Sequence, residues 1–180
     1  MSSKSVEIIS NDDRTPADVD PINEAIVVQD EIHTNIHRGV FFSASRYVAA
    51  LSDASTVEVL IQVSASQSAH VRFGGAVEVF EDTTFSSEGT TVTARNRNRF
   101  SANTADTVIT HTPTLTLDGT SLDDPALIPG GTHVNFSPGG QSRSFEEWIL
   151  STSKNYLVRL TNTSGNTTPV SVVLDLYEPS

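Results

Sequence analysis

Apolar and polar residues alternate along much of this chain, and the alternation predicts short β-strands. Within residues 155–161, Tyr156, Val158 and Leu160 fall on one face of an extended segment. Within residues 169–177 the alternate residues are aliphatic: Val170, Val172, Leu174 and Leu176. A Ser-Gly-Asn turn separates the two segments, so we expect the chain to finish with two strands that complete a core. Function is then expected in loops, on an outer sheet face or in the N-terminal segment.

Several earlier segments carry the same signal between turn-forming residues. They lie at residues 57–63, 70–73, 76–80, 114–117 and 132–137. Asp118-Gly119 and two Pro-Gly-Gly sequences supply turns between them. No convincing amphipathic helix and no long internal repeat is visible. The expected fold class is all-β, a jelly-roll-like antiparallel β-sandwich of roughly eight to ten strands.

An acidic segment precedes the predicted sandwich. The first 35 residues contain eight acidic residues against only Lys4 and Arg14. Such a composition is typical of a segment without a core of its own. We therefore expect an acidic, partly flexible N-terminal arm at residues 1–35, anchored through the aliphatic residues 25–28, and a β-sandwich domain at residues 36–180.

The composition argues against several classes of chemistry and partner. The chain has no cysteine, which excludes disulfides, thiolate metal sites and cysteine nucleophiles and fits a protein made in a reducing cytoplasm. Its formal net charge of -11 argues against nucleic acid, whose binding depends on cationic residues. No apolar run is long enough for a membrane span, and the N-terminus lacks the pattern of a signal peptide. We expect an unexported protein with neither a membrane nor a nucleic-acid partner.

The most unusual local pattern is an alternation of arginine and asparagine. In an extended strand it would place Arg95, Arg97 and Arg99 on one face and the asparagines on the other. Three neighbouring guanidinium groups favour an interface with the carboxylates of a partner, because arginine binds carboxylates bidentately and is enriched at interfaces. The alternatives are local pairing with Glu88, Asp106 or the acidic arm, a solvated loop, and nucleic acid.

No catalytic, cofactor or metal site emerges from the polar residues. Among five histidines, only His33 and His37 have a spacing that suits shared metal ligation on a helix, and no nearby carboxylate completes the set. No nucleophile-elbow motif is present. The carboxylate pairs Glu81-Asp82, Asp123-Asp124 and Glu146-Glu147 would point to opposite faces of a strand and could not act on one bond. We therefore expect a protein that is not an enzyme and has no cofactor or metal.

Several segments, taken in order, carry a resemblance to a group of phage proteins. They are Ser68–Val71, Glu78–Phe85, Ala94–Arg99, Glu147–Leu150 and Asn155–Gly165. In these segments the chain resembles small structural proteins encoded in the head gene clusters of tailed bacteriophages. These are taken as capsid decoration, or cement, proteins with a jelly-roll-like β domain. The resemblance covers residues 36–178, rests mostly on turn and strand residues, and does not include the acidic arm.

The resemblance implies a non-enzymatic virion protein that is made in the host cytoplasm and binds the outer surface of a capsid. Its function would be to stabilise the mature shell. Its partners would be the major capsid protein and further copies of itself, with a homotrimer favoured. A trimer that binds several neighbours at once would multiply modest contacts through avidity.

Under this hypothesis, part of the segment from His37 to Tyr47 and the arginine-rich segment are expected at capsid or trimer interfaces. The expected interface residues are Arg38, Phe41, Phe42, Arg46, Arg95, Arg97 and Arg99. Phe41 and Phe42 would point to opposite faces of a strand, so that one fills the core while the other meets a partner.

The alternative hypothesis is a receptor- or glycan-binding module of a phage tail or head fibre, because jelly rolls also serve as lectins. Such a module would need exposed aromatic side chains in a row. The single tryptophan, Trp148, lies in a segment that is expected to face the core.

Overall fold

The computed structural model describes residues 31–74, 77–122 and 147–179. The chain divides into two units, residues 1–34 and 35–180, and the second unit contains every described strand. Within it, two antiparallel β-sheets pack face to face, so the expected β-sandwich is confirmed at this level.

Three sequence predictions concern residues that these ranges leave out. They are the acidic arm up to Asp30, the two Pro-Gly-Gly turns at residues 129–131 and 138–140, and the strand at residues 132–137. The carboxylates Asp123, Asp124 and Glu146 also lie outside the described residues.

One sheet has five strands in the order β11-β3-β13-β1-β7. Its strands are β1 (Phe41–Leu51), β3 (Ala69–Gly74), β7 (Arg95–Asn96), β11 (Glu147–Leu150) and β13 (Thr168–Tyr177). All neighbouring strands in it are antiparallel. We call the side of this sheet that faces away from the sandwich core its outer face.

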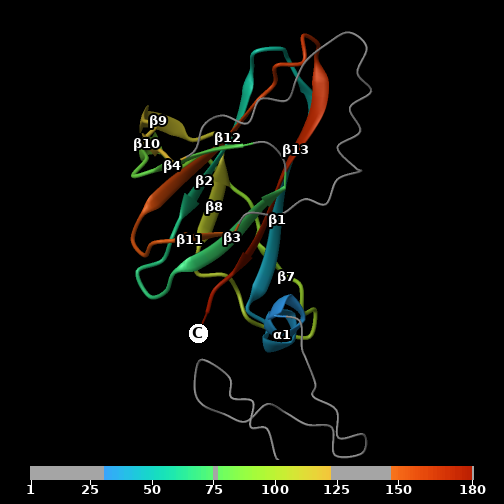
Figure 1. Cartoon of the computed structure of the whole chain (residues 1–180), viewed down its shortest axis with the longest axis vertical. Helices are drawn as coiled ribbons and strands as arrows, with labels where there is room; N and C mark the ends of the chain where they lie inside the picture. The colour runs from blue at the N-terminus through green and yellow to red at the C-terminus, as the bar shows by residue number, and fades with distance from the viewer. Residues whose placement is uncertain (1–30, 75–76, 123–146, 180) are drawn as a thin grey trace, which may run out of the picture. The chain divides into compact units, whose positions relative to one another are not determined.

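The other sheet has six strands in the order β10-β4-β12-β2-β8-β6. Its strands are β2 (Thr56–Gln62), β4 (Glu78–Glu81), β6 (Thr90–Thr91), β8 (Val108–His111), β10 (Thr120–Ser121) and β12 (Asn155–Thr161). Figure 1 shows β1 and β13 in one layer and β2, β4 and β8 in the other.

The core lies between the two sheets and contains the residues that the alternation selected. Tyr156, Val158 and Leu160 of β12 face Val172 and other aliphatic residues of β13 across it. The remaining buried members include Val57, Val59, Ile61, Val63, Leu174 and Leu176. Burying a side chain of this kind stabilises the fold by roughly 1.5–3 kcal/mol. Trp148 packs against the same core, as expected.

A third, two-stranded sheet belongs to the outer side of the six-stranded sheet. It consists of β5 (Thr84–Ser87) and β9 (Thr114–Leu117), and it lies beyond β4 in Figure 1. Leu60 and Leu157 face this outer side and are nevertheless 0% exposed. The outer side of the six-stranded sheet is therefore covered along its centre.

The two chain segments that build this layer follow the same path. After β4, the chain runs through β5, turns at Gly89 and adds β6 to β8. After β8, it runs through β9, turns at Gly119 and adds β10 to β4. The two segments are thus related by a local two-fold arrangement in which each supplies an edge strand to the other. No repeat was expected here, because the two segments share few identical residues.

The strand registers agree with this two-fold relation. Thr90 lies opposite His111, and Thr120 lies opposite Glu81. Asp82 and Thr112, which follow β4 and β8, both have a positive φ, at 60° and 53°. Each segment therefore leaves its sheet through the same unusual backbone conformation.

The structure also contains a helix that the sequence did not predict, α1 (Glu31–Arg38). Gly39 ends it with a φ of 71°. The Gly39 N–H donates to the Ile36 carbonyl (3.0 Å) and the Val40 N–H to the Asn35 carbonyl (3.1 Å). These two bonds form a Schellman motif, which explains how so short a helix ends at a fixed residue. The expected boundary after residue 35 falls inside this helix.

Candidate functional site

The described residues contain no group of three or more His, Cys, Asp or Glu side chains that could hold a metal ion. His33 and His37 both lie on α1, so the helical condition for shared ligation is met without a third ligand among these residues. No helix in the described ranges is long and apolar enough to cross a membrane.

The carboxylates of Glu81 and Asp82 bind the same cation, which corrects the expectation that they would point to opposite faces of a strand. Both bind the Lys154 ammonium group, at 3.2 and 3.1 Å. The reason is that β4 ends at Glu81, and the positive φ of Asp82 redirects the chain. These hydrogen bonds, that of Asp82 above all, raise the pKa of Lys154.

The two phenylalanines expected at an interface are both buried, at 2% exposure each. They do point to opposite faces of β1, since Phe42 belongs to the core cluster and Phe41 does not. Phe41 stacks on Tyr177, with 6.5 Å between ring centroids, and lies under the Arg97 guanidinium. The Phe41 ring is therefore covered by the chain itself, which corrects the expectation that one of the two rings would meet a partner.

A row of polar residues crosses the whole outer face of the five-stranded sheet. Strand pairing places Glu147 opposite Arg72, Arg72 opposite Asp175, and Asp175 opposite Ser43, which lies opposite Arg95. Opposite charges therefore alternate from β11 to β13, an arrangement that stabilises paired strands. The Ser43 hydroxyl donates to the Asp175 carboxylate at 2.5 Å.

Glu147 is the most highly coordinated carboxylate of this row. It accepts hydrogen bonds from the Arg72 guanidinium, from His70 Nδ1 (2.8 Å) and from the Tyr177 hydroxyl (3.3 Å). Partial burial would raise the pKa of Glu147, but the hydrogen bonds from His70 and Arg72 outweigh it, and the pKa lies below its ordinary value. These contacts attach the edge strand β11 to β3 and β13.

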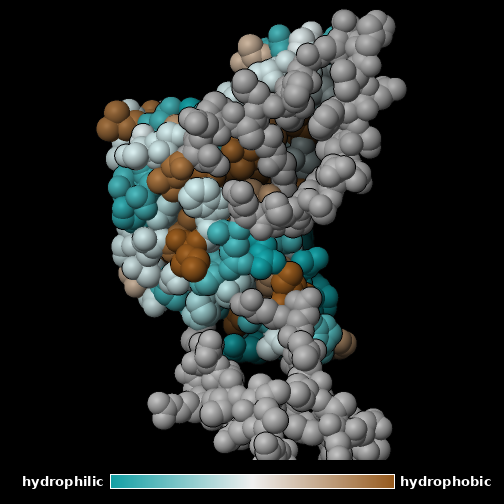
Figure 2. All heavy atoms as spheres, viewed as in Figure 1, coloured by the Kyte–Doolittle hydropathy of each residue, from teal (hydrophilic) through white to brown (hydrophobic). Residues whose placement is uncertain are grey.

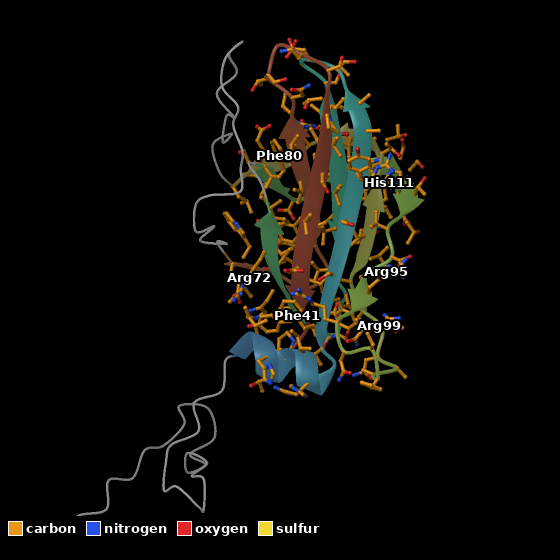
Figure 3. The ribbon with its side chains drawn as sticks, turned by 90° about the vertical axis from the view of Figure 1, so that its right-hand side faces the viewer. Phe41, Arg72, Phe80, Arg95, Arg99 and His111 are labelled. Atoms are coloured by element: carbon orange, nitrogen blue, oxygen red, sulfur yellow. The ribbon has the colours of Figure 1, made fainter. Side chains whose placement is uncertain are left out.

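The arginine-rich segment keeps strand periodicity only at its start. Arg95 lies opposite Ser43, and the Arg97 N–H donates to the Phe41 carbonyl, so both side chains lie on the outer face. β7 ends at Asn96, and Arg99 lies in a turn. Only Arg95 lies in a strand, whereas Arg97 lies in a bend and Arg99 in a turn, so the strand that was expected to place three arginines on one face is not formed. Figure 3 shows Arg95 and Arg99 on the same side of the domain.

The arginines differ in their partners. Arg97 binds Asp175 at 3.5 Å and covers the Phe41 ring at 5.3 Å from its centroid. Neither Arg95 nor Arg99 has an ion-pair partner among the described residues. Local pairing therefore occurs for one arginine, and with a carboxylate from β13 that was not considered from the sequence.

The asparagines of the same segment build the β7–β8 loop (residues 97–107). The buried Asn96 amide donates to the Gly39 carbonyl (2.8 Å) and to the Asn103 carbonyl (3.1 Å). Its side-chain oxygen accepts the Asn98 N–H at 2.9 Å. This last bond is an Asx turn, which fixes the backbone directly after the strand.

A second Asx turn follows at once. The Asn98 side-chain oxygen accepts the Phe100 N–H (3.0 Å), and its amide group donates to the His37 carbonyl of α1 (3.0 Å). The Ser101 side chain lies so close to Gly39 that a Cβ at residue 39 would overlap it. The first half of the loop therefore contacts the C-terminal end of α1.

Glu178 holds the other end of the loop. Its carboxylate, only 3% exposed, accepts the Asp106 N–H (2.9 Å) and the Thr107 N–H (2.7 Å). The Glu178 N–H donates to the Val40 carbonyl at 3.2 Å. A buried carboxylate requires such donors, because burial without them is costly. The loop is thus attached at both ends.

The last two predicted interface residues lie elsewhere. Arg46 shares the inward register of Ala44 on β1 and lies near His111 of β8. Burial, and then the charge of Arg46, lower the pKa of His111. Arg38 ends α1 and makes contacts within the chain. Arg46 is therefore separated from Arg95 and Arg97, which lie on the outer face.

One side chain that the structure exposes was not identified as exposed from the sequence. Phe100, at the tip of the β7–β8 loop, is 101% exposed. The signal that could have revealed it is the repeated Asn, because two Asx turns in succession predict a turn rather than a strand through Arg99 and Phe100. Figure 2 shows that apolar side chains on the visible face of the described residues form separate spots among hydrophilic atoms.

Comparison of the chain with protein-family models, with curated proteins and with solved structures finds no match.

Proposed function

We propose that the sandwich is a jelly roll. The strand order supports this assignment. Eight strands, β1 to β4 and β10 to β13, give the orders β11-β3-β13-β1 and β10-β4-β12-β2 in the two sheets. Successive strands in this set change sheet at every step except between β4 and β10, which is the order that two interlocking Greek keys produce.

We further propose that the protein is a decoration protein, which binds the outer surface of a phage capsid and stabilises the mature shell without catalysing a reaction. One observation carries the proposal. Arg95 and Arg99 are exposed cations without an acidic partner among the described residues, in a chain whose formal net charge is -11. A partner that supplies carboxylates would neutralise them, and arginine is suited to such contacts.

The energetics of this function depend on many weak contacts. A single interface of standard size buries about 1,600 Å² and gives affinities that range from micromolar to picomolar. An oligomer, with a trimer as the simplest case, would bind several shell subunits at once, and dissociation would then require all contacts to break together. The major capsid protein is the proposed partner.

The first test is the copy number of this chain in purified virions of the parent phage, measured by quantitative mass spectrometry against the major capsid protein. A simple integer ratio that corresponds to hundreds of copies is expected of a decoration protein. A few copies per particle would instead favour the receptor- or glycan-binding fibre module. Absence from the virion would contradict both.

The second test separates binding from folding. Arg95→Ser combined with Arg99→Ser is expected to weaken binding to capsids that lack this protein and to leave the thermal unfolding transition nearly unchanged, because neither side chain has a described partner. Arg97→Ser is the contrasting variant. It removes the contacts to Asp175 and Phe41 and should lower the unfolding temperature. Equal loss of stability in the double variant would assign Arg95 and Arg99 a structural role.

A further inference from the structure

Phe100 is the aromatic side chain that the described fold leaves most exposed. Phe41, Phe42, Phe73 and Phe80 are all buried, whereas Phe100 is 101% exposed. Single exposed apolar residues are common and usually need no explanation. Leu117 and Ile149 are exposed here in that ordinary sense, at 67% and 66%. Phe100 differs from them in the backbone that carries it and in its charged neighbours.

The backbone at Phe100 is fixed before any partner binds. The Phe100 N–H donates to the Asn98 side-chain oxygen, and the Ser101 N–H donates to the Asn98 carbonyl at 3.1 Å. Asn96 and Glu178 attach the two ends of the loop through buried polar groups. A side chain presented on such a loop loses little backbone freedom on binding, and preorganisation of this kind increases affinity.

The charged residues nearest to Phe100 in the sequence are arginines. Residues 93–105 contain three arginines and no acidic residue. Arg97 binds Asp175, while Arg95 and Arg99, which lie on the same side of the domain, have no described acidic partner. An aromatic residue among arginines has the composition that is enriched at the energetic centre of protein interfaces.

We propose that Phe100 is the central anchor of the interface, which inserts into an apolar pocket on a different protein, and that carboxylates around this pocket pair with Arg95 and Arg99. The inference rests on the proposed function and deepens it, because it names the chemistry that the shell surface must offer. Charge complementarity selects this partner. A polyanion would be repelled by a chain of net charge -11. A polyanion would also leave the apolar ring without a pocket.

The test compares Phe100→Ser with Leu117→Ser, which removes a similarly exposed apolar side chain from β9. Full-length variants are mixed with purified heads that lack this protein, and bound and free protein are separated by sedimentation. Phe100→Ser is expected to weaken binding by about tenfold or more, the effect of truncating an interface hot spot. Leu117→Ser should bind as the unsubstituted chain does. Both variants should unfold at the temperature of the parent, because both side chains are exposed.

The charged rim gives a second readout. Binding of the unsubstituted chain is expected to weaken as salt increases, and the Arg95→Ser, Arg99→Ser variant should lose most of that salt dependence. Phe100→Ser should keep the salt dependence while binding more weakly. A hydrophobic anchor and a charged rim are thereby distinguished in one titration.

Other results would overturn the proposal. If the unsubstituted chain binds heads and Phe100→Ser binds equally well, the anchor is wrong and the decoration function stands. If the unsubstituted chain does not bind heads, the proposed function fails and this inference fails with it. Self-association in sedimentation velocity that is lost in Phe100→Ser would assign the loop to a second copy of the chain. If deletion of residues 1–30 also abolishes this self-association, the acidic segment of the second copy is the partner of the loop.

Discussion

Gly89 and Gly119 occupy equivalent positions in the two segments related by the local two-fold arrangement, and each lies directly against the backbone of the other segment. A Cβ at Gly89 would overlap the carbonyl oxygen of His111, and a Cβ at Gly119 would overlap that of Glu81. Both glycines have a positive φ, at 85° and 101°. The contact between the two segments therefore depends on the absence of a side chain at both turns.

Replacement of either glycine by alanine is expected to destabilise the fold by more than the backbone strain alone, which is about 1 kcal/mol. The excess arises because a backbone carbonyl cannot move away as a side chain can. Gly165→Ala is the matched control, since Gly165 also has a positive φ but an added Cβ would meet nothing within 4 Å. Chemical denaturation of the three variants measures the difference. Equal losses in all three would mean that the close approach is relieved at no cost.

Asn96 is expected to determine the stability of the β7–β8 loop. Asn96→Ala removes an amide that donates to two buried or partly buried carbonyls, and should cost about 1–3 kcal/mol because these groups lose their partner. Thr104→Ala, at an exposed position of the same loop, should change stability by less than about 0.5 kcal/mol. Urea unfolding is the measurement. If Asn96→Ala unfolds like Thr104→Ala, the loop is not held by this amide.

Arg159 joins the six-stranded sheet to the turn after β9. Its guanidinium binds Glu58 and Asp118 at 2.8 Å each and lies over the Phe80 ring. The hydrogen bond from Arg159 lowers the pKa of Asp118, against the smaller opposing effect of burial. The hydrogen bond to Asp118 likewise raises the pKa of Arg159, so the guanidinium stays charged.

Arg159→Met is therefore expected to cost about 1–3 kcal/mol, because it leaves the partly buried Glu58 carboxylate without its cation. Asp118→Asn should cost less, since Asp118 is more exposed than Glu58. A thermal denaturation series on both variants and their combination gives the coupling between the two residues. Additive losses would contradict a shared network.

Glu147 should give the fold a stability that depends on pH. Its pKa is lower in the folded chain than its ordinary value of 4.5, so the carboxylate contributes stability above that pH. The contribution is lost as pH falls through the folded pKa. Compared with Glu147→Gln, the unsubstituted chain should be more stable by about 1 kcal/mol at neutral pH, and the difference should shrink below pH 4.5. Thermal unfolding between neutral pH and pH 3 measures it. A difference that stays constant over this range would contradict the assignment.

The sequence was sufficient for the strands β2, β12 and β13 and for their core residues, because alternation with period two directly reports which side chains face inward. It failed where a short-range polar contact overrides this period. The asparagines at 96 and 98 were placed on one face of a strand, but their side chains bond to the backbone ahead of them and end the strand. The rings of Phe41 and Phe42 were correctly placed on opposite faces. What the sequence could not predict is that Tyr177 and Arg97, distant along the chain, would cover the outer ring.

The position of β13 has a consequence for synthesis of the chain. It lies between β1 and β3 in the five-stranded sheet, and it pairs with β1 from Phe41 to Leu51. Until the ribosome has released β13, β1 and β3 lack the strand that lies between them, and the five-stranded sheet cannot form. Pairing of such distant segments is slow, and exposed strand edges aggregate. The nascent chain should therefore depend on chaperones until its final strand is in place.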